Sequence, residues 1–317
     1  MSLSERLHRA ASDLGSLCRL EEPLGPLTTY RVGGGAAIFA APASRTELYD
    51  VAAVVTRYDL PVLVVGRGSN LLIADSGFEG VAISLAELAD TIDVIGLEVR
   101  TGSAVALPVL ARKTAAVGLT GFEWAVGVPG SIGGAVRMNA GGHGSDMAAC
   151  LISAEVLDMR DMHCRWRPVE DLGLRFRGSN LCDHEIVLTA RLQLAAGDVA
   201  RSEREIADIV HWRRENQPGG QNAGSVFVNP VPGELSAGEL IDRLGLRGLR
   251  IGGAFVSEKH ANFIQAGEGA TASDVKAVMD EVRDRVAHST GFELRSEVRL
   301  VGFDTVEAVL PERGHRG

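Results

Sequence analysis

Residues 127–142 read GVPGSIGGAVRMNAGG, and six of these sixteen residues are glycine. Glycine serves where the backbone takes a positive φ or must approach another group closely, so this stretch strongly constrains the local chain. Two explanations fit such a stretch. It is either a surface where backbone N–H groups bind phosphates, or a tightly packed loop between a helix and a sheet.

Length and charge narrow the class of protein. The chain has 317 residues, which exceeds a usual single core, so two or three domains are expected. Hydrophobic residues make up 45% and charged residues 23%, as in globular proteins. The net charge of −9 argues against a general nucleic-acid partner, because a phosphate backbone needs a basic face. No feature indicates an obligate protein partner.

The cysteines and the N-terminal segment point to a reducing compartment. Cys18, Cys150, Cys164 and Cys182 show no C-x-x-C spacing, which predicts free thiols rather than a zinc site or a disulfide framework. The segment MSLSERLHRAASDLG carries charges where a signal peptide needs an apolar run. No apolar stretch approaches the ~20 residues of a membrane span. We therefore expect a cytoplasmic protein.

Helical and strand patterns follow one another along the chain and predict an α+β fold. An amphipathic helix is expected over residues 3–17, and a strand over residues 185–197 whose buried face carries Ile186, Leu188, Ala190, Leu192 and Leu194. A capping-box pattern predicts that a helix opens between Ser202 and Glu205. The strand–glycine pattern that ends in GRGSN, residues 66–70, is typical of nucleotide sites. It lacks the third glycine of the dinucleotide fingerprint, which disfavours a conventional Rossmann domain.

Three polar residues lie in loops that could carry chemistry. Arg177 lies in LRFRGSNL, Ser225 in QNAGSVFVNP and Glu297 in ELRSEVRLVG. Taken singly, each also fits an ordinary role as a solvated arginine, a turn-forming serine or part of a charged strand face. The absence of a G-x-S-x-G elbow leaves a hydrolase nucleophile unsupported.

A fourth stretch, SEKHANFI, places Lys259, His260 and Asn262 close together. A metal site needs several ligands at defined spacing, whereas this stretch holds one histidine beside a cationic lysine. Recognition of a polar ligand is therefore favoured, and no metal is expected.

Together these stretches resemble one family. In order, LTTYRVGGGA, VLVVGRGSNLL, GFEGVAISL, GVPGSIGGAVRMNAGG, FRGS, QPGGQNAGSVFVNP, SEKHANFIQAGEGATASDV and LRSEVRLVG cover about residues 23–302. They are similar to the motifs of the UDP-N-acetylenolpyruvoylglucosamine reductase (MurB) family, flavoproteins that make UDP-N-acetylmuramate for bacterial peptidoglycan. The resemblance implies an FAD-containing, NADPH-dependent oxidoreductase of cell-wall synthesis, on which cell shape and division depend.

The resemblance also implies a domain organisation. It predicts a vanillyl-alcohol-oxidase-type FAD-binding fold in two subdomains, residues 1–82 and 83–200. A C-terminal α+β substrate-binding domain would span residues 201–303, with a tail at residues 304–317.

The resemblance implies that the glycine loops at residues 66–70 and 127–142 hold the pyrophosphate and flavin of non-covalently bound FAD. The implied cofactor-binding residues are Arg31, Gly33, Gly66, Arg67, Gly68, Ser69, Asn70, Gly127, Val128, Pro129, Gly130, Ser131, Gly133, Gly134, Asn139, Ala140 and Gly141.

Residue roles carry over in the same way. Arg177 would stabilise the negative charge of an enolate-like intermediate, Ser225 would protonate its carbon, and Glu297 would orient and polarise its carboxyl group. The implied substrate-binding residues are Asn229, Lys259, His260 and Asn262.

The sequence departs from the family at three positions. Phe176 and His143 stand where the family usually has tyrosine, and Val228 stands where it commonly has lysine. These departures leave two other hypotheses open: a divergent flavin oxidoreductase with another substrate, and a catalytically silent UDP-sugar binder.

Overall fold

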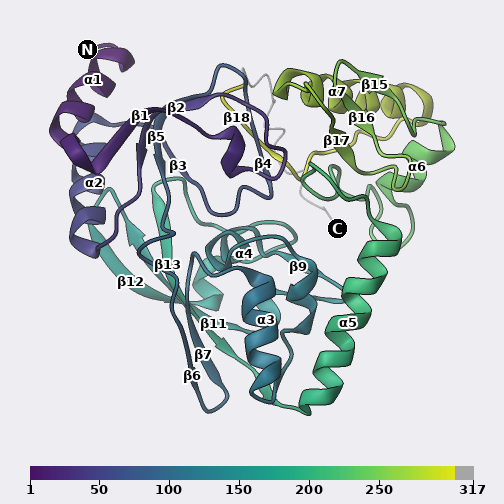
Figure 1. Ribbon diagram of the computed structural model, residues 1–317, viewed down its shortest axis with the longest axis horizontal. Coiled ribbons are helices and arrows are strands. Elements are labelled where there is room, and N and C mark those ends of the chain that lie inside the picture. Colours follow the sequence, from purple (N-terminus) through teal and green to yellow (C-terminus); the bar gives the residue numbers. More distant parts are fainter. Residues whose placement is uncertain (304–317) are drawn as a thin grey trace, which may run out of the picture.

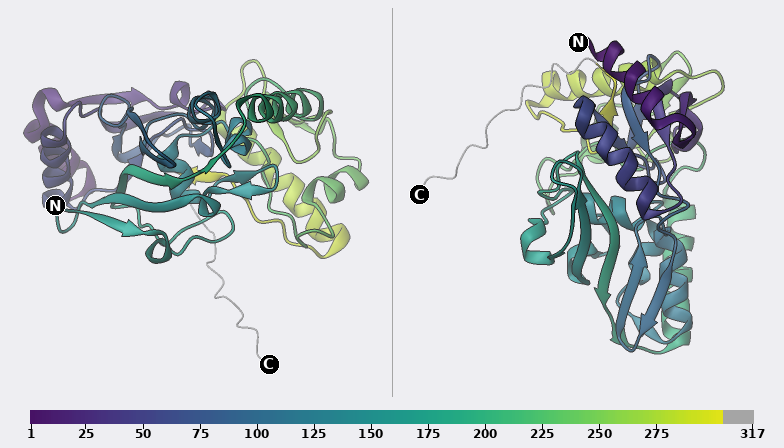
Figure 2. Two further views of the ribbon diagram at one scale, coloured as in Figure 1. Left: turned by 90° about the horizontal axis from the view of Figure 1, so that it is seen from below. Right: turned by 90° about the vertical axis from the view of Figure 1, so that its left-hand side faces the viewer.

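The structure is a computed structural model that describes residues 1–303, so the predicted tail at residues 304–317 lies outside the described residues. Figure 1 shows a purple N-terminal group of elements, a teal central group and a green-to-yellow C-terminal group. Figure 2 places the N-terminal and C-terminal groups at opposite ends of the molecule. Both helices and strands build each group, which confirms the predicted α+β class.

The N-terminal group is a four-stranded sheet covered by two helices. Its spatial order is β1 (Cys18–Pro23), β2 (Gly35–Ala40), β5 (Phe78–Ile83) and β3 (Val62–Val64). The pair β1–β2 is antiparallel, whereas β2 and β3 both lie parallel to β5. Helices α1 (Leu3–Leu14) and α2 (Arg45–Tyr58) bury Leu14, Leu48 and Val51 in one core with Ile38 and Val81 of the sheet.

The central group is a five-stranded antiparallel sheet. Its order is β12 (His163–Pro168), β11 (Leu151–Asp158), β13 (Glu185–Gln193), β7 (Glu98–Gly102) and β6 (Ile92–Ile95). Helices α3 (Leu107–Ala116), α4 (Ile132–Met138) and α5 (Val199–Asn216) contribute to its core. Short pairings join β8 (Leu119–Thr120) to β14 (Ala195–Ala196), and β9 (Gly141–Gly142) to β10 (Ser145–Asp146).

A β-bulge changes the expected face of β13. All five predicted core residues of this strand are buried, but they do not share one core. Ile186 and Leu188 pack with the N-terminal group, whereas Ala190 and Leu192 pack with the central group. The pairing with β11 skips Leu188, and this extra residue reverses the alternation. The predicted single face is therefore wrong, because alternation holds only between bulges.

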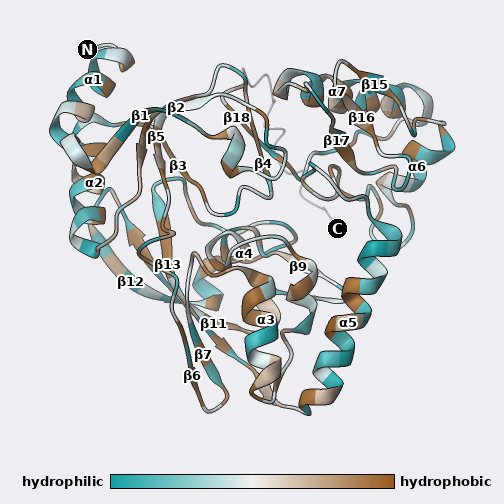
Figure 3. Cartoon of the chain, viewed as in Figure 1, coloured by the Kyte–Doolittle hydropathy of each residue, from teal (hydrophilic) through white to brown (hydrophobic). Residues whose placement is uncertain are grey.

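The helix α5 starts earlier than the capping pattern predicted. Asp198 is its N-cap, whereas the Ser202 hydroxyl lies inside the helix and donates to Glu123 Oε1 at 2.5 Å. Ile206 and Ile209 of α5 are buried in the core of the central group. Figure 3 shows hydrophobic and hydrophilic residues alternating along this helix, as expected for one buried face. The predicted domain start at residue 201 falls inside α5, and the division itself stays a prediction.

The C-terminal group is a small sheet with two helices. Strands β15 (Arg250–Ile251), β16 (Ala254–Val256) and β17 (Ile264–Ala266) are joined in that order, beside α6 (Ala237–Arg243) and α7 (Ala272–Thr290). Helix α7 buries a face of valines at helical spacing. Its buried members are Val275, Val278, Val282 and Val286.

The chain then returns to the N-terminal group. Strand β18 (Arg299–Val301) lies parallel to β4 (Leu71–Ile73), and Arg299 N–H donates to Asn70 O at 2.9 Å. This pairing brings the C-terminal segment beside the glycine loop at residues 66–70. Within residues 1–303, no helix has both the length and the apolar character that crossing a membrane requires.

Asp75 fixes the C-terminal group to the N-terminal one through the start of α7. Its carboxylate accepts from the N–H groups of Ala272 and Ser273, both at 2.9 Å, and from the Ser273 hydroxyl at 2.6 Å. Burial acts to raise the pKa of Asp75, but these hydrogen bonds outweigh burial and lower it. The anion at a helix N-terminus is stabilising.

We predict that Asp75→Ala lowers the free energy of unfolding at pH 7 by about 1 kcal/mol, as for loss of a helix cap. Because the folded pKa is lowered, the stabilisation is present at neutral pH. It is lost as the pH falls through that pKa, so wild type and variant should converge in acid. Thermal unfolding from pH 7 to pH 3 measures this. Asp50→Ala, at an exposed position on α2, is the control, and an equal loss in both variants would contradict the capping role.

Candidate active site

The glycine-rich stretch is closely packed at one glycine and borders a cleft at the next. It runs from a 3₁₀ turn, Glu123–Gly127, into α4. A Cβ on Gly133 would lie 2.8 Å from Ser103 Cβ, so this glycine allows close packing. A Cβ on Gly134 would meet Ser131 Oγ at an ordinary 3.5 Å, yet Gly134 lines a cleft. A side chain at Gly134 would fill space that a ligand can occupy.

The cleft lies between α4, the loop after β3 and the segment before β13. Beside it, the buried Ser103 hydroxyl has no hydrogen-bond partner within the described residues. Buried polar groups are nearly always paired, so a ligand group is the expected partner. The predicted cofactor residues that line this cleft are Gly66, Arg67, Ser131, Gly133 and Gly134.

The cleft carries excess positive charge. Arg67, Arg137 and Arg299 line it, together with Asp183 and Glu185. Glu185 is already paired with an arginine outside the cleft at 2.6 Å, which leaves three cations against one carboxylate. Such a donor set suits the diphosphate of a dinucleotide.

The cleft residues that were not predicted from the sequence include Ser103, Arg137, Asp183 and Arg299. Two of them carried a usable signal. Arg137 is the one charged residue of the glycine-rich stretch, and Arg299 follows Glu297 by two residues. Ser103 and Asp183 lie outside any motif, and only the packing brings them to the cleft.

Arg177 lies at the tip of a tight turn in which Arg175 and Gly178 exchange two backbone hydrogen bonds. Its φ of +56° is left-handed, which is uncommon for a residue with a side chain. Arg177 Nε donates to Glu297 Oε2 at 3.0 Å, across a separation of 120 residues in sequence. The structure therefore brings these two predicted catalytic residues into direct contact.

Backbone pairing places Ser225 near the same carboxylate. Glu297 N–H donates to Val226 O at 2.7 Å, and Val228 N–H donates to Arg295 O at 2.9 Å. Ser225 directly precedes Val226 and is half-buried. All three predicted catalytic residues thus lie on segments that meet at one place.

Burial and the charge of Arg177 have opposite effects on the pKa of the Glu297 carboxyl. Its side chain is 16% exposed, and this burial raises its pKa. The charge and hydrogen bond of Arg177 oppose the effect, yet the pKa remains above its ordinary value. Glu297 therefore holds a proton more readily than an exposed glutamate does.

Two predicted binding residues support these segments through their side chains. The buried Asn262 amide accepts from Phe227 N–H at 2.9 Å and donates to Phe227 O at 2.8 Å. Asn70 Nδ2 donates to Glu297 O at 2.9 Å. Both amides hold the backbone beside Ser225 and Glu297, a role that their motifs did not indicate.

Other predicted residues are also bonded within the protein. Asn139 Oδ1 accepts from Ala148 N–H at 2.9 Å, and Asn229 Oδ1 accepts from the first N–H of α6 at 3.1 Å. Lys259 Nζ donates to a backbone carbonyl, and the His260 ring packs on an aromatic ring. Asn139 and Gly141 line a second hollow that contains Arg177. The remaining predicted cofactor residues line neither hollow: Arg31, Gly33, Gly68, Ser69, Asn70, Gly127, Val128, Pro129, Gly130 and Ala140.

Two family models match the chain. Residues 36–164 match an FAD binding domain, and residues 216–301 match the C-terminal domain of UDP-N-acetylenolpyruvoylglucosamine reductase. The reductase of Heliobacterium modesticaldum is 43% identical, over 89% of this chain and 90% of its own length. The chain belongs to the MurB family. The Bacillus subtilis reductase is 38% identical over 89% of this chain and 93% of its own length.

A solved MurB structure agrees with this assignment. The enzyme from Thermus caldophilus superposes with a TM-score of 0.77 at 35% identity, and the match covers 90% of this chain and 99% of that one. The predicted combination of an FAD-binding fold with a C-terminal MurB domain is confirmed. Residues 1–303 hold no cluster of three or more potential metal-ligating side chains.

The three departures from the MurB pattern have defined surroundings. Phe176 is 62% exposed, and the Arg177 guanidinium lies 5.0 Å from its ring centre. His143 packs edge-on against Trp212, with ring centres 5.4 Å apart. Val228 is fixed by its backbone pairing. Phe176 therefore keeps an aromatic face under the arginine without the hydroxyl of the family's tyrosine.

We predict that Arg177→Gln raises the pKa of Glu297 further, because the charge that opposes burial is removed. Infrared titration of the carboxyl band should show protonation persisting to higher pH than in wild type. Glu297→Gln assigns the band, since it removes it. An unchanged titration in Arg177→Gln would mean that the pair at 3.0 Å does not control this proton.

Proposed function

We propose that this protein reduces UDP-N-acetylglucosamine enolpyruvate to UDP-N-acetylmuramate, with FAD as bound cofactor and NADPH as reductant. The observation that carries the proposal is the convergence of Arg177, Glu297 and the Ser225 segment in a chain of the MurB family.

The cleft beside α4 suits the FAD. Gly66, Ser131 and Gly134 would lie against it, and Arg67 would face its phosphates. The unpaired Ser103 hydroxyl offers a further hydrogen bond. When bound, the flavin supplies the chemistry of accepting hydride from NADPH and delivering it to the enolpyruvyl double bond.

Arg177 supplies a fixed positive charge for the reaction. Addition of hydride to the enolpyruvyl group places negative charge on the neighbouring carbon and its carboxylate. A guanidinium held by the turn at residues 175–178 is preorganised to stabilise that charge, because it need not reorient as the charge develops. Its planar fork also matches a carboxylate in two-point contact.

Ser225 is the proposed proton donor. A serine hydroxyl is a weak acid, so it protonates only a strongly basic partner, which an enolate carbon is. The Asn262 amide makes two hydrogen bonds to the backbone of Phe227 in the same loop, which limits the movement of Ser225.

Glu297 would govern the carboxyl group of the substrate. Its raised pKa lets it carry a proton in the site, and Arg177 limits how far the pKa rises. In this role the protonated carboxyl donates to the substrate carboxylate, whereas the ionised form would repel it. The substrate and NADPH are nucleotides of the cell interior, so we also propose a cytoplasmic location.

The deciding experiment is an anaerobic titration of the purified protein. We predict a yellow protein that releases intact FAD on denaturation. The residues that line the cleft include no cysteine, histidine or tyrosine that could form a covalent bond to the flavin. NADPH should bleach the flavin, and the enolpyruvyl substrate should restore its absorbance. Flavin retained by the precipitated protein would disprove non-covalent binding.

The same titration separates the two alternatives left by the sequence. A divergent oxidoreductase would be bleached but would not be reoxidised by the enolpyruvyl substrate. A silent UDP-sugar binder would show no bleaching with NADPH.

We predict that Ser225→Ala blocks only the second half-reaction. Flavin reduction by NADPH should remain fast because it requires no acid. Reoxidation by the enolpyruvyl substrate should slow by at least ~10²-fold, as expected for loss of a general acid. Stopped-flow absorbance measures both steps. Ser236→Ala, at the N-cap of α6, is the matched control; equal slowing of both steps in Ser225→Ala would mark Ser225 as a turn residue.

A further inference from the structure

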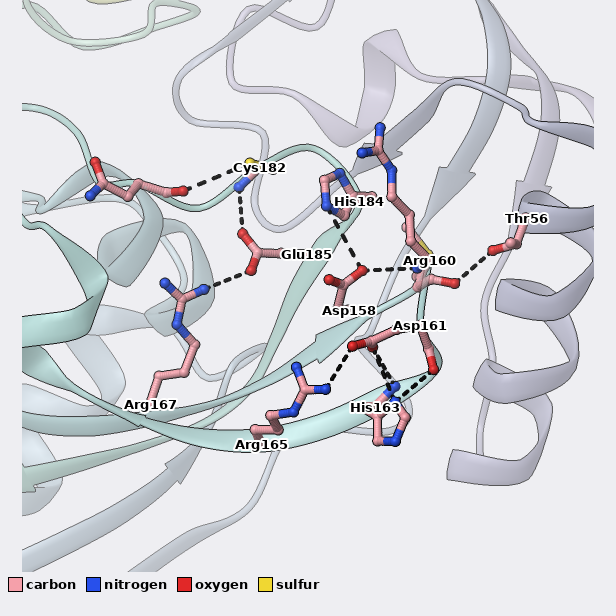
Figure 4. Close-up of polar contacts among 12 residues, drawn as sticks. Thr56, Asp158, Arg160, Asp161, His163, Arg165, Arg167, Cys182, His184 and Glu185 are labelled. Atoms are coloured by element: carbon pink, nitrogen blue, oxygen red, sulfur yellow. Dashed lines mark hydrogen bonds and ion pairs between the residues drawn. The ribbon is translucent and has the colours of Figure 1, made fainter.

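The loop before β13 carries Asp183 into the cleft. Figure 4 shows the contacts of Cys182 and Glu185, which lie on either side of Asp183 in the sequence. Arg167 Nη1 donates to Glu185 Oε1 at 2.6 Å, and Cys182 N–H donates to Glu185 Oε2 at 2.7 Å. Because residues on both sides of Asp183 are held, the loop presents this carboxylate at a defined place.

One oxygen of Asp183 accepts from two arginines of distant segments. Arg137 Nη2, from α4, lies at 2.5 Å, and Arg299 Nη2, from β18, lies at 2.9 Å. Arg137 Nη1 also donates to Cys182 O at 2.8 Å. Burial and the charge of Arg299 lower the pKa of Arg137, as expected for two cations facing each other. The carboxylate between them offsets this repulsion.

The segments joined by Asp183 also carry the catalytic pair. Asp183 follows Arg177 by six residues, and Arg299 follows Glu297 by two. The loop and the C-terminal strand are therefore linked twice, by Arg177–Glu297 and by Asp183–Arg299. The second link lies in the cleft and also includes α4 of the glycine-rich stretch.

We propose that Asp183 is a positioning residue for the reduction. Together with Arg137 and Arg299 it forms a clamp, the Asp183 clamp, that holds the C-terminal strand at the cofactor cleft and so keeps Glu297 in place beside Arg177. The inference rests on the proposed function, because Glu297 acts in that reaction. The partners of Asp183 are Arg137 and Arg299, so it acts through Arg299 on the segment that carries Glu297.

The exposure of the clamp predicts where its effect is measured. The Asp183 side chain is 59% exposed, and exposed ion pairs contribute little to stability. The clamp should therefore change the geometry of the site much more than the unfolding temperature. Small misplacements of a catalytic group slow a reaction severely, so kinetics are the sensitive measurement.

The test uses the FAD-loaded enzyme and the variant Asp183→Asn, which keeps the shape and removes the charge. Reoxidation by the enolpyruvyl substrate should slow by ~10-fold or more, while KM for this substrate and reduction by NADPH change by less than ~3-fold. The unfolding temperature should fall by less than ~3 °C. Asp183→Glu, which keeps the charge, should recover part of the rate.

Asp161→Asn is the matched control. Asp161 is also a partly exposed aspartate paired with an arginine, Arg165 at 2.7 Å, but it lies in the connection between β11 and β12 and not in the cleft. It should leave both half-reactions unchanged. Equal slowing in Asp161→Asn and Asp183→Asn would overturn the proposal.

A second measurement does not depend on turnover. Backbone amide exchange of residues 296–301 should be faster in Asp183→Asn. The Arg299 side chain then loses its ion pair with Asp183, although its backbone N–H still donates to Asn70 O. Arg299→Gln breaks the clamp from the other side and serves if Asp183→Asn does not fold. The double variant should be no slower than the slower single one, since both remove one clamp.

Unchanged exchange together with an unchanged reoxidation rate in Asp183→Asn would overturn the clamp, as would losses that multiply in the double variant. A wild-type enzyme that the enolpyruvyl substrate does not reoxidise would instead refute the proposed function. In that case the exchange of residues 296–301 alone would decide whether the clamp exists.

Discussion

The site depends on the parallel pairing of β18 with β4. This pairing joins the last described strand to β4. The C-terminal group lies between the two strands in the sequence. The pairing is fixed at the glycine loop by Arg299 N–H to Asn70 O and by Asn70 Nδ2 to Glu297 O, both at 2.9 Å. The pairing places the segment that carries Glu297 beside this loop, and there Glu297 contacts Arg177. The contact between Arg177 and Glu297 is thus a consequence of this long-range pairing.

The resulting contact balances two opposing effects. Burial of the Glu297 carboxyl disfavours its charge, whereas Arg177 favours it. A partly buried pair of this kind is weak support for stability, because desolvation offsets the attraction. Its effect is on the Glu297 carboxyl, whose pKa stays above its ordinary value beside the Arg177 guanidinium. The left-handed backbone of Arg177 is a local cost that the turn at residues 175–178 sustains for this contact.

The glycine-rich stretch shows that one motif can meet two demands. Gly133 allows α4 to approach Ser103, while Gly134 leaves room in the cleft. Close packing and an open cleft wall are therefore found at neighbouring residues and do not exclude each other. The Asn262 amide, which the motif predicts to bind substrate, is hydrogen-bonded to the backbone of Phe227. An asparagine in a motif does not reveal its partner, because the partner is chosen by the fold.

Local patterns determined the helix faces and the order of the motifs, and the motifs determined the family. The valines of α7 recur at helical spacing in the sequence. They therefore share one face of the helix, and that face is buried. The bulge at Leu188 was decided elsewhere, by pairing with β11. The start of α5 is local, because the Asp198 side chain accepts from Arg201 N–H at 2.8 Å, whereas the Ser202 hydroxyl bonds the distant Glu123. The meeting of Asp183, Arg137 and Arg299 is likewise tertiary. Contacts between residues so far apart in sequence depend on the closure of the sheets, and no local spacing encodes them.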